Sequence, residues 1–398
     1  MTLSAVTELG EKIDRAWRKV NFDLSAFPEL CATSLETAQL PDRIDPADLV
    51  QAVFAGRLPA QADPRALFGE PPVTLFRAPR FYIDALFWVD GTTSIHDHSF
   101  SGAFQVLSGS SIETTFSFDR RHDIGGHFLF GDLTVRGSAL RRRGNVRAIP
   151  AGPGYIHSLF HLARPSVSLV VRTRRDPNVG AQMEYAPPGL AYDSFMEDPG
   201  RDRMLQVVDM LRKTENPAFE ETVGALIASL DSHAAFSIIQ TCTRNADTAL
   251  VDRLIDRVSN VDHASKIRGW VHHRRRIDFL ITRRRLVRED DLRFFIAVLL
   301  NAQRRSDALA VVAQFAPAIP PEKQVAQWLR RLSETTMRFR LDNAELQPNV
   351  LGLPTFHAGY EQVVEDILCN KTRSAPPEVE VFVRDLKRLP PLMCLFVE

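Results

Sequence analysis

Two histidines separated by one residue, His96 and His98, lie between stretches of branched and aromatic residues that predict β-strands. Alternate side chains of a strand point to the same face, so this spacing directs both imidazoles to one side. A helix would direct them to different sides. Neutral imidazole is a common ligand of divalent metals, so the pair supplies two ligands of a candidate metal site.

A third histidine follows a tight turn further along the chain. A short predicted strand after Gly144 leads to Pro150 and Gly152, and His157 comes where the next strand should begin. Such a turn reverses the chain and can carry His157 across a barrel toward the pair. His161 is the alternative third ligand. We prefer His157 because it lies nearer the turn, which leaves His161 in the core or beside the ligands.

Both stretches resemble the two sequence motifs of the cupin family. The matching positions are Gly91, His96, His98 and Gly109 in the first motif, and Gly144, Pro150, Gly152 and His157 in the second. Compared with the usual spacing of these motifs, the chain has one residue fewer before His96 and two residues more before His157. The glutamate usual in the first motif is absent, because Gly102 and Ala103 occupy its place.

Among cupins, the chain resembles the cysteine dioxygenase type, which binds iron with three histidines and no carboxylate. The resemblance covers about residues 75 to 175 and includes the run 94–98. It implies a non-haem Fe(II) oxygenase that oxidises a small thiol or related substrate with O2, the substrate being free or carried on a peptide or protein. The ligand set also suits Zn(II), Ni(II) or Mn(II). The alternatives are a metal-binding sensor or scaffold without turnover, and a metal-dependent isomerase or hydrolase.

The same resemblance suggests which residues contact substrate. The family holds the substrate carboxylate with an arginine from an early strand, and Arg77 and Arg80 lie in that region. A family Ser-x-His-x-Tyr run here has Val170 and Arg172 in place of its histidine and tyrosine, which weakens the case for free cysteine as substrate. Arg172 becomes a candidate for holding an anionic group.

Three further residues are candidates from their position near the motifs. Tyr82 and Tyr155 are the tyrosines available to replace the lost phenol, although each is more often a packed aromatic. Gln105 is expected to face the pocket if its strand is regular.

The pattern of the whole chain predicts an α+β fold with a cupin-type antiparallel β-barrel. Residues 1–72 are expected to be helical and to pack on the barrel, which spans residues 73–182. Residues 183–200, rich in proline and glycine, are predicted to be a linker. Residues 201–398 carry apolar stripes at helical spacing and predict an all-α domain that serves a protein partner or self-association.

Composition limits the classes of partner. The chain has 398 residues and zero formal net charge, with no overall attraction to nucleic acid or anionic lipid. The basic run 266–285 is therefore expected to be a solvated helix face. The apolar run 294–300 is too short to span a membrane, the first residues lack a signal-peptide pattern, and four scattered cysteines indicate a reducing compartment. We expect a cytoplasmic protein without a membrane partner.

Overall fold

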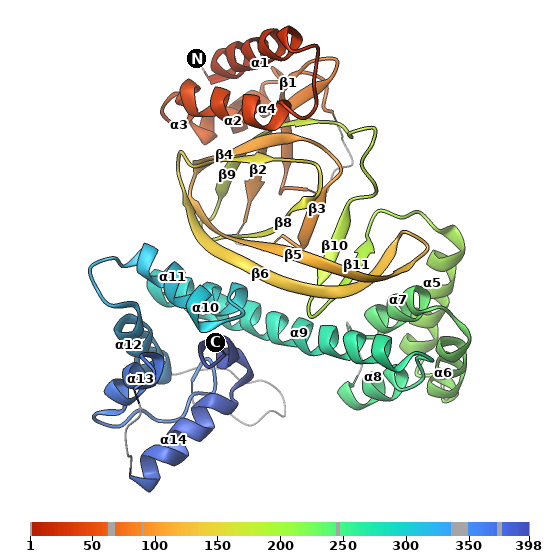
Figure 1. The fold of residues 1–398 in the computed structure, drawn as a ribbon, viewed down its shortest axis with the longest axis vertical. Coiled ribbons are helices and arrows are strands. Elements are labelled where there is room, and N and C mark those ends of the chain that lie inside the picture. Colours follow the sequence, from red (N-terminus) through yellow and green to blue (C-terminus); the bar gives the residue numbers. More distant parts are fainter. Residues whose placement is uncertain are drawn as a thin grey trace.

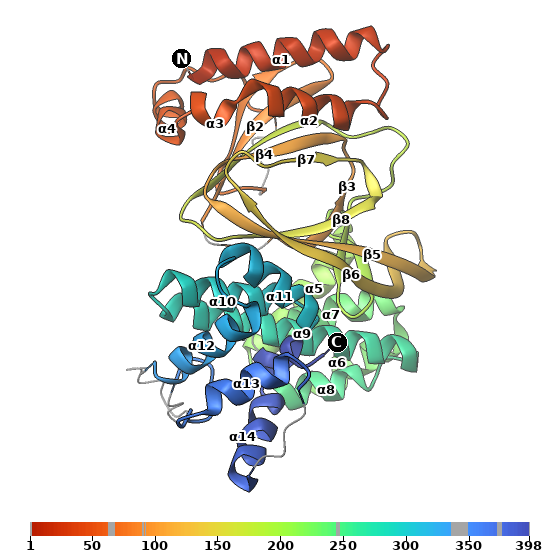
Figure 2. The same cartoon turned by 60° about the vertical axis from the view of Figure 1, so that its left-hand side comes forward.

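The computed structural model describes residues 2–62, 68–89, 91, 93–243, 247–335, 349–371 and 376–397. It has three layers, with an antiparallel β-barrel between an N-terminal helical layer and a larger C-terminal helical region (Figures 1 and 2). The predicted α+β class with an antiparallel β-barrel is confirmed. No helix within these residues combines the length and apolar character needed to cross a bilayer.

Two antiparallel sheets form the barrel layer. The first has the order β1-β2-β9-β4-β7, and the second closes on itself in the order β10-β11-β6-β5-β8-β3. The strands are β1 (Pro72–Arg77), β2 (Phe81–Trp88), β3 (Ile95–His98), β4 (Gly102–Ser108), β5 (Ser110–Ile124), β6 (Phe128–Arg142), β7 (Val146–Ile149), β8 (Gly152–His161), β9 (Ser166–Thr173), β10 (Met183–Ala186) and β11 (Leu190–Asp193).

The N-terminal helices cover the outer face of the first sheet. They are α1 (Thr2–Lys19), α2 (Phe27–Ala38), α3 (Leu40–Arg43) and α4 (Pro46–Phe54). Trp17 and Phe27 pack at a tilt with ring centroids 4.0 Å apart, and both lie against Phe81 of β2. Burial of these large rings stabilises the contact between helices and sheet. Asp45 caps α4 by accepting a hydrogen bond from the amide of Ala47.

The segment predicted as a linker, residues 183–200, contains two strands of the closed barrel. β10 pairs with β3, the strand that carries the histidine pair, and β11 pairs with β6. Between them, the proline and glycine residues 187–189 form the turn of a hairpin. A Cβ atom on Gly189 would lie 1.9 Å from the carbonyl oxygen of Gly131, so this turn needs glycine. The barrel therefore extends to Asp193.

The C-terminal helical region packs against the second sheet on the side opposite the N-terminal helices (Figure 1). Its elements are α5 (Pro199–Lys213), α6 (Phe219–Ser229), α7 (Ser232–Thr243), α8 (Thr248–Ile255), α9 (Val261–Leu286), α10 (Asp290–Asn301), α11 (Arg305–Phe315), α12 (Pro321–Ser333), α13 (Tyr360–Leu368), α14 (Pro377–Arg388) and the 3-10 helix η1 (Pro390–Leu395). Helix α9 runs along the barrel wall (Figure 1), and Lys266 donates a hydrogen bond to the carbonyl oxygen of Gly131.

Strand β8 contributes to two different cores. Tyr155 and Leu159 face the space between the two sheets, where they pack with residues of β2, β4 and β9. Phe160 faces the other way and joins Ile112 of β5 in the core built around α10. Because side chains alternate along a strand, His157 and His161 lie on the inner face with Tyr155.

Candidate metal centre

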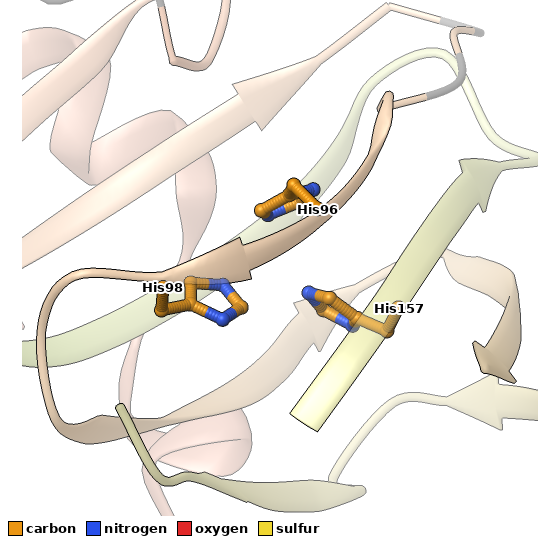
Figure 3. A group of neighbouring side chains, drawn as sticks. All are labelled: His96, His98 and His157. Carbon is orange, nitrogen blue, oxygen red and sulfur yellow. The ribbon is translucent and has the colours of Figure 1, made fainter. Parts of the chain in front are cut away.

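Three histidines meet between the two sheets. His96 and His98 come from β3 and His157 from the adjacent β8, and each ring offers one nitrogen such that all three nitrogens lie within 4.8 Å of one another. The ring centroids are 4.7 to 5.0 Å apart, and the rings converge on one point (Figure 3). All three side chains are buried. This is the set that the sequence singles out.

Two of the three histidines have a buried ring nitrogen without a hydrogen-bond partner. His96 Nδ1 donates to the carbonyl oxygen of Ser94 at 2.9 Å, which fixes the tautomer and leaves Nε2 buried and unpartnered. His98 Nδ1 is also buried without a partner. Burial lowers the pKa of His96 to about 3 and the pKa of His98 well below its usual value. Neutral, buried and unpartnered imidazoles fit a divalent metal ion.

A buried carboxylate that the sequence motifs do not indicate orients the third histidine. Tyr155 donates its hydroxyl hydrogen to Glu113 Oε1, and the tyrosine oxygen lies 2.9 Å from His157 Nδ1. Since the tyrosine uses its only hydrogen on the carboxylate, His157 Nδ1 is the donor, and its Nε2 is left for a metal. Glu113 Oε1 itself lies 3.5 Å from the same nitrogen.

Glu113 remains charged because its surroundings compensate for burial. Its side chain is 1% exposed, and Arg141 donates to its Oε2 through Nε at 2.7 Å and through a second guanidinium nitrogen. Burial alone raises the pKa of Glu113, but hydrogen bonding by His157 and the charge of Arg141 outweigh it and lower the pKa to about 2. Glu113 supports the centre from outside the three-histidine group.

The missing glutamate of the first motif has a steric explanation. A Cβ atom on Gly102 would lie 1.9 Å from the carbonyl oxygen of Val171 on β9, so no side chain fits there. Ala103 faces the opposite way and packs in the core beneath the N-terminal helices. Neither position can carry a carboxylate to the centre.

Of the other candidates, Arg172 and Tyr82 lie beside the centre. The guanidinium of Arg172 lies 4.2 Å from the ring centroid of Phe100 and 5.1 Å from that of Tyr82. Phe100 in turn packs edge-on against His98 at 4.8 Å. The Nε atom of Arg172 is buried and has no hydrogen-bond partner among the described residues. A guanidinium whose buried Nε donor is unused suits an anionic group.

Three candidates lie elsewhere. Arg80 packs its guanidinium 4.4 Å from the ring centroid of Phe22, beside the N-terminal helices, and Arg77 is exposed at the end of β1. Gln105 points away from the inter-sheet space, since its amide nitrogen lies 3.3 Å from the carbonyl oxygen of Gly144 and 3.5 Å from that of Leu35 on α2. The expectation that Gln105 faces the pocket is wrong, because alternation on β4 turns Phe104 and Val106 inward.

His161, the alternative third ligand, is outside the three-histidine group. Its ring stacks on Trp88 with centroids 4.4 Å apart and an interplanar angle of 7°. The Nε2 atom of His161 is buried and has no hydrogen-bond partner. Among the described residues, however, the only group of side chains close enough to hold a metal ion is His96, His98 and His157. Stacking holds the ring of His161 against the indole.

No protein family model and no curated protein sequence matches the chain. Among solved structures it is similar to TT1209 from Thermus thermophilus, with 20% identity over 31% of this chain and 95% of that one, and a TM-score of 0.20. It is also similar to a cupin-2 domain containing protein from Shewanella frigidimarina, with 14% identity over 27% of this chain and 82% of that one, and a TM-score of 0.19. Hydroquinone 1,2-dioxygenase from Sphingomonas sp. TTNP3 is similar with 13% identity over 28% of this chain and 70% of that one, and a TM-score of 0.22.

Proposed function

We propose that this chain is a metal-dependent cupin oxygenase of cysteine dioxygenase type, which uses Fe(II) and O2 to oxidise a small thiol or related anionic substrate. The observation that supports the proposal is the convergence of three buried imidazoles, two of which, His96 and His98, have a buried ring nitrogen without a hydrogen-bond partner. Ferrous iron would supply the open coordination positions at which O2 and substrate meet. His96, His98 and His157 would hold it.

The surrounding residues suit an anionic substrate. Imidazole ligands carry no negative charge, so a divalent ion in the site would keep its full charge and attract a thiolate. Arg172 lies on the inner face beside His98, and its buried Nε supports a role in holding a carboxylate or similar group. Tyr155 and Glu113 fix the ring of His157 and the position of its proton at Nδ1.

A metal-binding and oxygen-uptake experiment tests the proposal. Protein reconstituted with Fe(II) should bind one equivalent, and the variant with His96, His98 and His157 all changed to alanine should lose it. The matched control is His161→Gln, a buried histidine of the same strand as His157, which should keep iron. Retention of iron by the triple variant would contradict the ligand assignment.

Substrate class is tested on the iron-loaded protein with three thiols. One carries both a carboxylate and an amine, one only a carboxylate, and one only an amine. O2 consumption that requires the carboxylate would support the role of Arg172. Iron binding without O2 consumption for any thiol would favour a sensor or scaffold, and turnover only with Zn(II) would favour a hydrolase.

A further inference from the structure

A cavity of about 660 Å³ lies outside the candidate metal centre, between the barrel and the helical region. It opens where the loop after β8 meets the junction of α9 and α10. This volume is in the range of small-molecule sites. Its charged lining residues are Arg164, Arg284, Arg285, Arg288, Arg293 and Asp290. Five arginines and one aspartate give the lining an excess of four positive charges, although the whole chain has zero net charge.

Two of these arginines are fixed by backbone carbonyls. Arg284 is 3% exposed, and its Nε donates to the carbonyl oxygen of Arg293 at 2.9 Å. Arg293 returns the contact by donating Nη1 to the carbonyl oxygens of Arg284 at 3.0 Å and Val287 at 3.2 Å. These carbonyl acceptors are neutral and orient the guanidinium groups, while the nearby carboxylate of Asp290 raises the pKa of both and partly offsets their mutual repulsion.

The positive charges repel one another. Burial and the charge of Arg293 lower the pKa of Arg284 to about 9, and burial and the charge of Arg164 lower the pKa of Arg293. A bound anion would relieve this repulsion. Arg164, Arg285 and Arg288 are exposed and lie at the mouth of the cavity, where they can reach a ligand.

An aromatic surface adjoins the charged lining. Phe294 is buried and stacks on Phe315 with centroids 3.9 Å apart, while Phe315 itself is 39% exposed. A partly exposed ring beside clustered guanidinium groups suits a ligand that joins a phosphate to a flat apolar part. We propose that this cavity binds a phosphorylated small molecule of nucleotide size, with the phosphate on the arginines and the planar part against Phe315.

Calorimetric titration tests the proposal with four probes, namely pyrophosphate, ADP, adenosine and a short single-stranded RNA, at physiological salt. Pyrophosphate and ADP should bind, and adenosine should not. The double variant Arg164→Gln/Arg288→Gln should lower both affinities at least about tenfold, because charge-assisted hydrogen bonds are lost. Phe315→Ala should weaken ADP binding and leave pyrophosphate binding unchanged.

The controls separate this site from general charge and from the metal centre. Arg203→Gln/Arg384→Gln removes the same charge from exposed positions of α5 and α14 and should leave affinity unchanged. Melting temperature checks that each variant folds. Affinity should be equal with Fe(II) and with a chelator, so the outcome does not depend on the oxygenase proposal. Absence of binding at millimolar probe, equal loss in the control pair, or binding of RNA alone would overturn the proposal.

Discussion

Glu113 and Tyr155 form one buried network that orients His157, a candidate metal ligand. The carboxylate lies on β5, next to the strand of His157, and its charge is balanced by Arg141. Because the tyrosine hydrogen goes to the carboxylate, the imidazole must donate from Nδ1. The proton position on His157 therefore depends on Glu113.

Replacing Glu113 by Gln should weaken Fe(II) binding about 10- to 100-fold, as loss of a group that orients a metal ligand typically does. The neutral amide no longer favours the tautomer that leaves Nε2 for the metal. Competition with a coloured chelator measures the affinity. Glu220→Gln, an exposed glutamate paired with Arg253, is the control. Equal affinities of the Glu113 variant and wild type would contradict the role.

Arg172→Gln should raise the KM for an anionic substrate about tenfold or more and leave iron content unchanged, since the guanidinium packs on Phe100 and Tyr82 and is not one of the three candidate ligands. Steady-state O2 uptake and metal analysis provide the two readouts. A substrate analogue without the anionic group should be used equally well by variant and wild type. Loss of iron together with activity would show that Arg172 acts through the fold.

Strand β3 is held in place by the residue between its two histidines. Asp97 points to the opposite side of the strand from the imidazoles, where it accepts hydrogen bonds from the amide of Met183 at 2.8 Å and from the hydroxyl of Tyr185 at 2.9 Å. Both donors lie on β10, so one carboxylate connects β3, the strand of the candidate metal centre, to the hairpin that completes the barrel.

Asp97→Ala should lower the free energy of unfolding by about 1–3 kcal/mol, because it leaves buried donors on β10 without an acceptor. Tyr185→Phe removes only one of the two bonds and should cost less, about 1 kcal/mol. Urea denaturation measures both. An Asp97→Ala variant as stable as wild type would show that β10 does not depend on this carboxylate.

The element that sequence periodicity predicts best is the histidine-bearing strand, because a period of two fixes which side chains share a face. The same periodicity does not predict that Glu113 is buried beside the histidines. The apolar residues Ile112 and Phe116 predict that the other face of β5 meets water, whereas the closed sheet buries that face as well. A strand pattern alone does not show whether the second face is covered. The 187–189 turn likewise looks the same in a linker and in a hairpin.

At the scale of the whole molecule, His233 joins the barrel to the helical region. Its ring on α7 stacks on Phe128 of β6 at 4.7 Å, and Arg201 of α5 donates to its Nε2 at 2.8 Å. Burial and the charge of Arg201 lower the pKa of His233 to about 4. The ring is therefore neutral at pH 7, and protonation would remove the acceptor that Arg201 uses.

Stability should fall as the pH drops from about 6.5 toward 4. The unfolded chain, with an ordinary histidine pKa, binds the proton first in this window, so protonation favours unfolding. Melting temperatures measured from pH 8 to pH 4 should decline less steeply for His233→Gln than for wild type. Identical slopes for the two proteins would show that His233 does not contribute.

Strand β8 connects the candidate metal centre to the C-terminal helices, because its two faces lie in different cores. Its inward residues include an imidazole of the candidate metal centre, and its outward Phe160 is embedded among the helices around α10. Any shift of those helices against the wall would push on the same short stretch of backbone that holds His157. Strand β8 thus couples the packing of the helices to the position of His157. Removing the C-terminal helices should therefore expose the apolar outer face of this strand and displace the His157 imidazole at the same time.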